Sequence, residues 1–209
     1  EGAWRVTNTG PAPVRVRIAA VSREDYLMGN RDTGSPDWLR VLERRVVLGA
    51  GAETRVAFRA SLPPGGRGER IAIVFFAEES LGGAATVQGR IGTAFYLMAA
   101  GSLEPRIEIL SFALAPDRVR LELVNTGNVH LRPEGEFALA DSAGRILLER
   151  VPLPPGMAVL PGARERYGSS SFPAALPPDT YAVRYRIRTG VVDGKPGPVL
   201  AGERTIAVR

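Results

Sequence analysis

The chain of 209 residues contains no cysteine, a single histidine and a single lysine. Without cysteine it has no disulfide, no thiol chemistry, no cysteine-ligated zinc and no iron–sulfur cluster. With His130 alone, a three-histidine metal site is excluded, and a Ser-His-Asp triad would have to use this residue. The sequence also lacks an apolar run of the roughly 18 to 20 residues that a membrane-spanning helix needs.

Positive charge exceeds negative charge only slightly and is spread along the chain. The net charge of +5 arises from 13 basic and 10 acidic residues in 1–101, and from 14 and 12 in 102–209. Proteins that bind nucleic acid gather their positive charge on one face, whereas arginine and glutamate alternate here. We therefore expect no nucleic acid among the partners.

Short apolar runs separated by turn residues dominate what is present. The 24 glycines and 17 prolines are scattered between these runs, which favours many strands over helices. Apolar and polar residues alternate in 14–18, 118–124 and 181–188, as in half-buried strands, and 71–77 has the nearly continuous apolar character of a central strand. About seven strands in each half predict an all-β protein made of two tandem immunoglobulin-like antiparallel β-sandwich domains.

An internal repeat supports this division. Three short motifs occur in both halves in the same order: residues 6–10 with 123–127, 48–51 with 160–163, and 62–64 with 176–178. A repeat of this kind marks related structural units. We predict domains at 1–101 and 102–209, with the boundary in the segment Gly-Ser-Leu-Glu-Pro.

The two halves differ at their start. Residues 106–114 predict an opening strand for the second domain, and the equivalent strand of the first domain would precede Glu1. We expect that strand and a leader to lie upstream in a longer precursor. The alternative is a true open edge, whose free N–H and C=O groups pair with any suitable strand.

The candidate catalytic and metal-binding residues lack the neighbouring sequence features that each kind of site requires. Asp32 begins the Asp-Thr-Gly-Ser tetrapeptide of aspartic proteases, but no apolar strand precedes it and no second copy exists. Nothing places the hydroxyls of Ser169, Ser170 and Ser171 near the histidine. Acidic residues such as Asp25 do not form the alternating loop of a calcium site. We predict a protein that is not an enzyme, with no catalytic residue, no metal and no cofactor.

Residues 4–98 resemble the N-terminal immunoglobulin-like domain of PapD-like periplasmic pilus chaperones. The resemblance rests on a first strand ending in Asn8, the Leu-Pro-Pro step at 62–64 and a long final strand over 89–97. The second half is similar to bacterial surface modules of the same sandwich class. The resemblance implies donor-strand complementation, in which the final strand lends alternating apolar side chains to a subunit that lacks a strand.

The resemblance also implies site residues on that final strand. Val87, Ile91, Phe95 and Leu97 share one face and would contact the partner. Arg90 lies on the other face and matches approximately one of the two basic residues that anchor the terminal carboxylate of the subunit. Its spacing to the aromatic pair is one residue longer than in the family, and the second anchor would fall in the missing strand. Ordinary core packing is the alternative role for this face.

Taken together, these features predict an exported, non-enzymatic protein-binding module of the periplasm or cell surface. It would act as a chaperone-like assembly factor by pairing strands with another protein or peptide. One alternative is a structural spacer in a larger surface protein. The other is a sandwich-fold hydrolase, for which the sequence offers no site.

Overall fold

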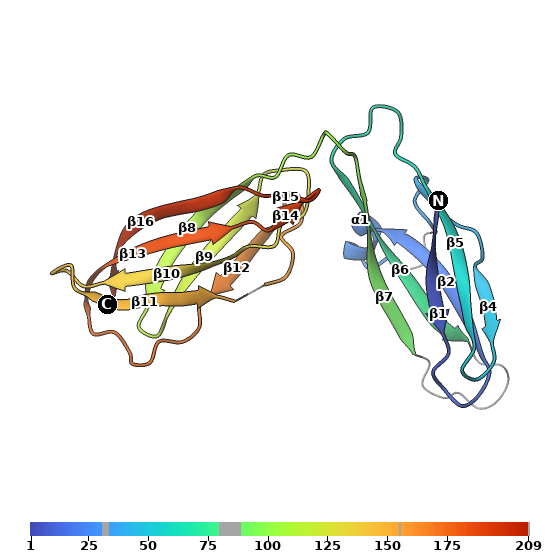
Figure 1. The fold of residues 1–209 in the computed structure, drawn as a ribbon, viewed down its shortest axis with the longest axis horizontal. Helices are drawn as coiled ribbons and strands as arrows, with labels where there is room; N and C mark the ends of the chain where they lie inside the picture. The colour runs from blue at the N-terminus through green and yellow to red at the C-terminus, as the bar shows by residue number, and fades with distance from the viewer. Residues whose placement is uncertain (31–33, 80–88, 155, 209) are drawn as a thin grey trace. The chain divides into compact units, whose positions relative to one another are not determined.

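A computed structural model describes residues 1–30, 34–79, 89–154 and 156–208 (Figure 1). The chain forms two compact units, Glu1–Ala99 and Ala100–Arg209, which we call the first and second domains. Both are built from antiparallel strands, as the sequence predicted for the fold class. Within the described ranges, no helix is long and apolar enough to span a bilayer.

The first domain consists of two antiparallel sheets and one short helix. Its strands are β1 (Gly2–Thr7), β2 (Val14–Ser22), β3 (Leu39–Val41), β4 (Arg45–Leu48), β5 (Glu53–Ala60), β6 (Glu69–Glu79) and β7 (Arg90–Met98). One sheet has the strand order β1-β5-β3 and the other β4-β2-β6-β7. The helix α1 (Arg23–Leu27) begins where the Ser22 hydroxyl accepts a hydrogen bond from the Asp25 N–H.

Aromatic side chains fill the space between the two sheets of the first domain. The rings of Trp4 and Phe58 have centroids 4.2 Å apart, and Trp4 meets the rings of Phe76 and Phe95 edge-on at 6.0 and 5.9 Å. Offset and edge-to-face pairs of this kind add to the free energy gained by apolar burial. These contacts link β1 to β6 and β7 across the sandwich.

Strand β6 is buried on both faces, as its apolar sequence predicted. Val74 is fully buried, and Phe75, on the opposite side of the strand, is 7% exposed. The Phe75 ring lies 6.0 Å from that of Tyr26 in α1, and the guanidinium of Arg90 in β7 lies over the Phe75 ring. The helix and the neighbouring strand therefore cover the outer face.

The second domain repeats this plan with one more strand at its start. Its strands are β8 (Ile107–Ala115), β9 (Arg118–Asn125), β10 (Glu134–Ala140), β11 (Ile146–Leu153), β12 (Arg164–Gly168), β13 (Asp179–Arg188), β14 (Val191–Val192), β15 (Lys195–Pro196) and β16 (Val199–Val208). The main sheets have the orders β12-β9-β8 and β11-β10-β13-β16, and β14 and β15 form a small hairpin. Leu123, Phe137 and Ile187 lie at the centre of its core.

A tyrosine corner closes one end of the second domain. The Tyr181 hydroxyl donates a 2.8 Å hydrogen bond to the Pro177 carbonyl, four residues earlier. The side chain is 1% exposed, and this burial raises the pKa of Tyr181, with a smaller contribution from the negative charge of Asp179. The motif Leu-Pro-Pro-Asp-Thr-Tyr is typical of a tyrosine corner, and this hydrogen bond forms one.

The asparagine of the first repeat motif anchors the turn after β1. Asn8 is 6% exposed, and its Nδ2 donates to the carbonyls of Ala12 at 2.8 Å and Gly49 at 2.9 Å. Its Oδ1 accepts a 2.9 Å hydrogen bond from the Gly10 N–H. One buried amide thus satisfies backbone groups from two turns.

Asn125 forms the same hydrogen bonds in the second domain. Its Nδ2 donates to the carbonyls of Val129 and Val159, both at 2.8 Å, and its Oδ1 accepts from the Gly127 N–H at 2.9 Å. Asn125 is completely buried. The repeat in the sequence is therefore a repeat of structure, with β1 equivalent to β9.

The second motif aligns one residue away from the predicted pairing. Gly51 and Gly162 occupy the same turn position with φ of 67° and 74°, a left-handed conformation that favours glycine. Their separation is 162 − 51 = 111, whereas pairing 48–51 with 160–163 requires 112. The turn geometry, not the shared leucine, fixes the alignment.

Candidate functional site

Strand β7 lies at the edge of its sheet, where the described residues place β6 on one side and no strand on the other. The Glu78 N–H donates to the Gly89 carbonyl at 2.9 Å. Because hydrogen-bonded pairs alternate along an antiparallel ladder, Arg90, Gly92 and Ala94 direct their N–H and C=O groups away from β6. This edge can accept a further strand.

The side chains of β7 divide between the core and the surface. Phe95 is half-buried, and its ring centroid lies 5.1 Å from that of Phe58 and 6.2 Å from that of Trp38. Ile91, four residues earlier on the same face, is 71% exposed. The structure therefore gives Phe95 a packing role in its own domain and leaves Ile91 accessible to a partner.

Arg90 lies on the opposite face of β7, as the alternation of side chains predicted. Its guanidinium carbon is 3.6 Å from the centroid of the Phe75 ring, a cation–π contact. A carboxylate bound by Arg90 would have to approach from this outer face. Of the other two predicted contact residues, Leu97 is half-buried and Val87 lies outside the described residues.

An apolar groove of about 420 Å³ adjoins the exposed side chain of Ile91. It is lined by Val6 from β1, Val16 from β2, Phe76 from β6 and Ile91 from β7, with Glu78 at its border. A lining of this composition suits apolar side chains better than a polar small molecule.

The groove residues Val6, Val16 and Phe76 were not among the residues predicted to contact a partner. Inward and outward side chains alternate along their strands, so the sequence could identify each of these residues as facing inward. Only the packing of two sheets shows that these residues border a common groove.

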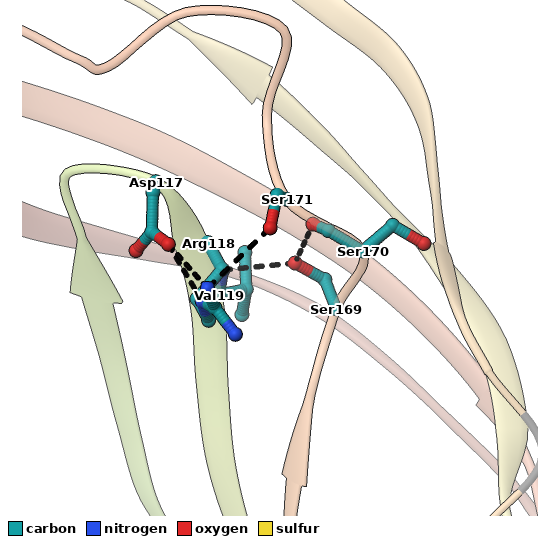
Figure 2. A network of polar contacts seen from close by, with 6 residues as sticks. All are labelled: Asp117, Arg118, Val119, Ser169, Ser170 and Ser171. Atoms are coloured by element: carbon teal, nitrogen blue, oxygen red, sulfur yellow. Dashed lines mark hydrogen bonds and ion pairs between the residues drawn. The ribbon is translucent and has the colours of Figure 1, made fainter.

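The hydroxyls of Ser169 and Ser171 belong to a polar network around the start of β9 (Figure 2). Ser169 Oγ accepts a 3.0 Å hydrogen bond from the Val119 N–H and donates to the Ser170 carbonyl at 2.8 Å. The neighbouring Arg118 guanidinium is hydrogen-bonded to Asp117 and holds the pKa of that carboxyl below its usual range. The network ties β9 to the segment that follows β12.

The remaining polar candidates do not converge on one site. Asp32 lies outside the described residues. Glu79 forms ion pairs with Arg17 at 3.5 Å and Arg45 at 3.2 Å on neighbouring strands. Among residues 1–30, 34–79, 89–154 and 156–208, no three histidine or acidic side chains group as metal ligands. His130 borders a shallow depression of the second domain.

Comparisons with known proteins place the fold. No protein-family model and no curated protein matches the sequence. The structure is similar to that of the YadV chaperone, with 12% identity, a TM-score of 0.50 and coverage of 99% of this chain and 92% of YadV. The class 5 fimbriae chaperone CfaA shares 15% identity at a TM-score of 0.50, with coverage of 94% and 89%.

A third similar structure contains a bound partner. It is the Salmonella enterica SafA pilin in complex with the SafB chaperone, with 12% identity, a TM-score of 0.50 and coverage of 96% and 87%. At these identities the likeness establishes a shared fold. The resemblance to pilus chaperones that residues 4–98 indicated is confirmed at that level, and it extends over both domains.

Proposed function

We propose that this protein is a non-enzymatic assembly factor that binds another protein by strand pairing at β7. The observation that carries the proposal is the combination of an unpaired edge with an exposed apolar side chain. Arg90, Gly92 and Ala94 present backbone groups to an incoming strand, while Ile91 and the groove offer an apolar contact. Backbone pairing would set the register, and the side chains would supply the fit.

The composition of the β7 edge also supports a binding role. Edge strands are commonly protected from pairing by charged residues, by proline or by a covering segment. Arg90 is the only charged residue in β7, and the strand contains no proline. From 91 to 98 the strand is uncharged, which favours association with another strand.

The partner in this proposal is a protein subunit that accepts an extended strand. The SafB chaperone is bound to a pilin, and a chaperone of the same fold would act on a comparable surface subunit. We place the protein in the periplasm or at the cell surface for the same reason. The absence of cysteine is compatible with an oxidising compartment.

A proline substitution at the edge tests the proposal. Ala94→Pro removes an N–H that points away from β6 and leaves the β6 ladder intact, because proline is tolerated on the open side of an edge strand. The probes are fluorescently labelled peptides of twelve residues that alternate leucine or valine with threonine. We expect Ala94→Pro to weaken binding at least about tenfold in fluorescence anisotropy.

The matched control is Ala94→Ser, which retains the N–H and should bind the peptides like the unchanged protein. Ile91→Glu should also weaken binding, because it replaces an apolar side chain of the groove with a charged one. The first domain of Ala94→Pro and of Ile91→Glu should unfold at the same denaturant concentration as that of the unchanged protein. Full peptide affinity in a correctly folded Ala94→Pro protein would contradict strand pairing at β7.

A further inference from the structure

A trough of about 620 Å³ lies on the outer face of the β12-β9-β8 sheet in the second domain. It follows the outward side of β9, the central strand, where Arg118, Arg120 and Glu122 occupy alternate positions. Ser111 from β8 and Arg166 from β12 complete its polar lining. Three guanidinium groups and one carboxylate therefore line the trough, which gives it a net positive charge.

Arg120 lies between two small residues of the neighbouring strands. The strand register places it opposite Ala113 of β8 on one side and opposite Gly168 of β12 on the other. Across the described part of the chain, its exposed guanidinium group forms no hydrogen bond and no ion pair. The donors of this group are therefore available to a ligand.

The fold does not require glycine at position 168. A Cβ on Gly168 would meet only the Arg118 Cδ at 3.8 Å and the Val119 carbonyl oxygen at 3.9 Å, both ordinary van der Waals distances. Glycine within a strand also costs conformational entropy, so packing and backbone conformation would both allow a larger residue. What glycine does provide at this position is open space beside Arg120.

Arg118 is compensated within its own domain. Its Nε donates a 2.8 Å hydrogen bond to the Asp117 carboxylate, and its Nη2 donates to the Ser171 hydroxyl at 3.4 Å (Figure 2). This guanidinium group is therefore committed to the network at the start of β9. It borders the trough with little charge left for a ligand.

Arg166 is held much less firmly. Its Nε lies 3.9 Å from the Glu122 carboxylate, and its side chain is 87% exposed. Arg166 lies opposite Glu122, which is two residues from Arg120, so the two arginines are diagonal neighbours on adjacent strands. Long side chains in this arrangement can reach a common ligand. Guanidinium groups bind carboxylates through paired, charge-assisted hydrogen bonds, so the trough offers two positions for carboxylates.

A β-bulge adds an apolar side chain to the border of the trough. Leu110 and Ser111 of β8 both lie opposite Glu122, and Leu110 is 44% exposed. Bulges redirect side chains in this way. An exposed leucine beside guanidinium groups suits a peptide, which carries apolar and acidic side chains together, better than it suits an inorganic anion. The length of β9 from 118 to 122, about 13 Å, also matches a short extended segment.

We infer that the trough binds an acidic, extended segment of a partner protein, with carboxylates at Arg120 and Arg166 and an apolar side chain against Leu110. An anionic membrane is a poorer occupant, because Asp117 and Glu122 would repel its phosphate groups. A short segment can instead place its carboxylates at the two arginines alone. This site belongs to the second domain and does not depend on strand pairing at β7.

The test titrates the full chain into a labelled peptide of eight residues that alternates glutamate with leucine. We expect saturable binding in fluorescence anisotropy at low salt, and no binding when glutamine replaces glutamate. Arg120→Gln should weaken binding at least about tenfold. The matched control is Arg150→Gln, which removes the same charge from the other sheet and should leave the affinity unchanged.

A second variant fills the trough without changing its charge. Gly168→Val places a branched side chain beside Arg120 and should also weaken peptide binding at least about tenfold. Urea unfolding would verify that each variant is folded. Because Arg120 has an exposed side chain without a partner in the described structure, Arg120→Gln should unfold like the unchanged protein.

Several results would overturn this inference. They are equal binding of the glutamine peptide, unchanged affinity in Arg120→Gln, and an equal loss in Arg150→Gln, which would indicate attraction by net charge alone. Loss of binding in Ala94→Pro but not in Arg120→Gln would place the peptide at β7. Vesicles of phosphatidylglycerol that bind through Arg120 when the peptide does not would identify a membrane site instead. Each of these results leaves the binding of uncharged peptides at β7 to be judged by its own variants.

Discussion

Replacing Asn125 with alanine should destabilise the second domain selectively. The side chain is completely buried and forms three hydrogen bonds, all of which are lost on its removal. The Val129 carbonyl then loses the side-chain partner, while the Val159 carbonyl keeps the Leu131 N–H and the Gly127 N–H keeps the Arg106 carbonyl. At about 1 kcal/mol for each lost bond, the free energy of unfolding should fall by about 3 kcal/mol. With a urea dependence of about 2 kcal/mol per molar, the midpoint should fall by about 1.5 M.

The two domains can be followed separately in this experiment. Tryptophan emission reports the first domain alone, and far-UV circular dichroism reports both. Asn125→Ala should shift part of the dichroism transition and leave the tryptophan transition in place, while Asn8→Ala should shift the tryptophan transition together with the first domain's part of the dichroism change. Thr126→Ala, an exposed neighbour, should change the unfolding free energy by less than about 0.5 kcal/mol. If Asn125→Ala behaved like this control, the buried amide would not be the anchor we describe.

Further predictions concern single side chains. Burial raises the pKa of Tyr167 to about 12, so the neutral phenol is favoured in the folded state. The stability that this shift contributes is complete below pH 10 and is lost as the pH rises from 10 to 12; absorbance titration should show a late tyrosine that Tyr167→Phe removes. Tyr181→Phe loses the hydrogen bond to the Pro177 carbonyl and should lower the free energy of unfolding in urea by about 1 kcal/mol. An unchanged free energy of unfolding would argue against the tyrosine corner. Phe95→Ala should destabilise the first domain by about 2 kcal/mol in tryptophan-monitored unfolding, whereas an unchanged midpoint would mean that Phe95 does not pack in the core.

Local patterns were sufficient to predict the architecture. Period-two alternation at 14–18 and 181–188 identified strands, because each has one face in a core and one in water. The tyrosine corner can also be identified from a local motif, since its hydrogen-bond donor and acceptor lie four residues apart. The Asn-Thr-Gly repeat revealed two related domains for a similar reason, because the asparagine amide closes a turn within its own segment.

Contacts between distant segments could not be predicted in the same way. Ile91 and Phe95 occupy the same face of β7, and alternation cannot tell which of them has a neighbour across the sandwich. Trp4 and Phe58 cover Phe95, whereas Ile91 lines the groove. The groove itself depends on how two sheets pack, which a linear pattern does not specify.

Residue-resolved amide hydrogen exchange, measured with and without a bound alternating peptide, tests strand pairing at β7 most directly. The amides of Arg90, Gly92 and Ala94 face away from β6 and should exchange rapidly in the free protein. On binding they should become protected, while Thr93, already bonded to β6, should change little. Protection confined to other strands, with these three amides still exchanging rapidly, would contradict the central claim.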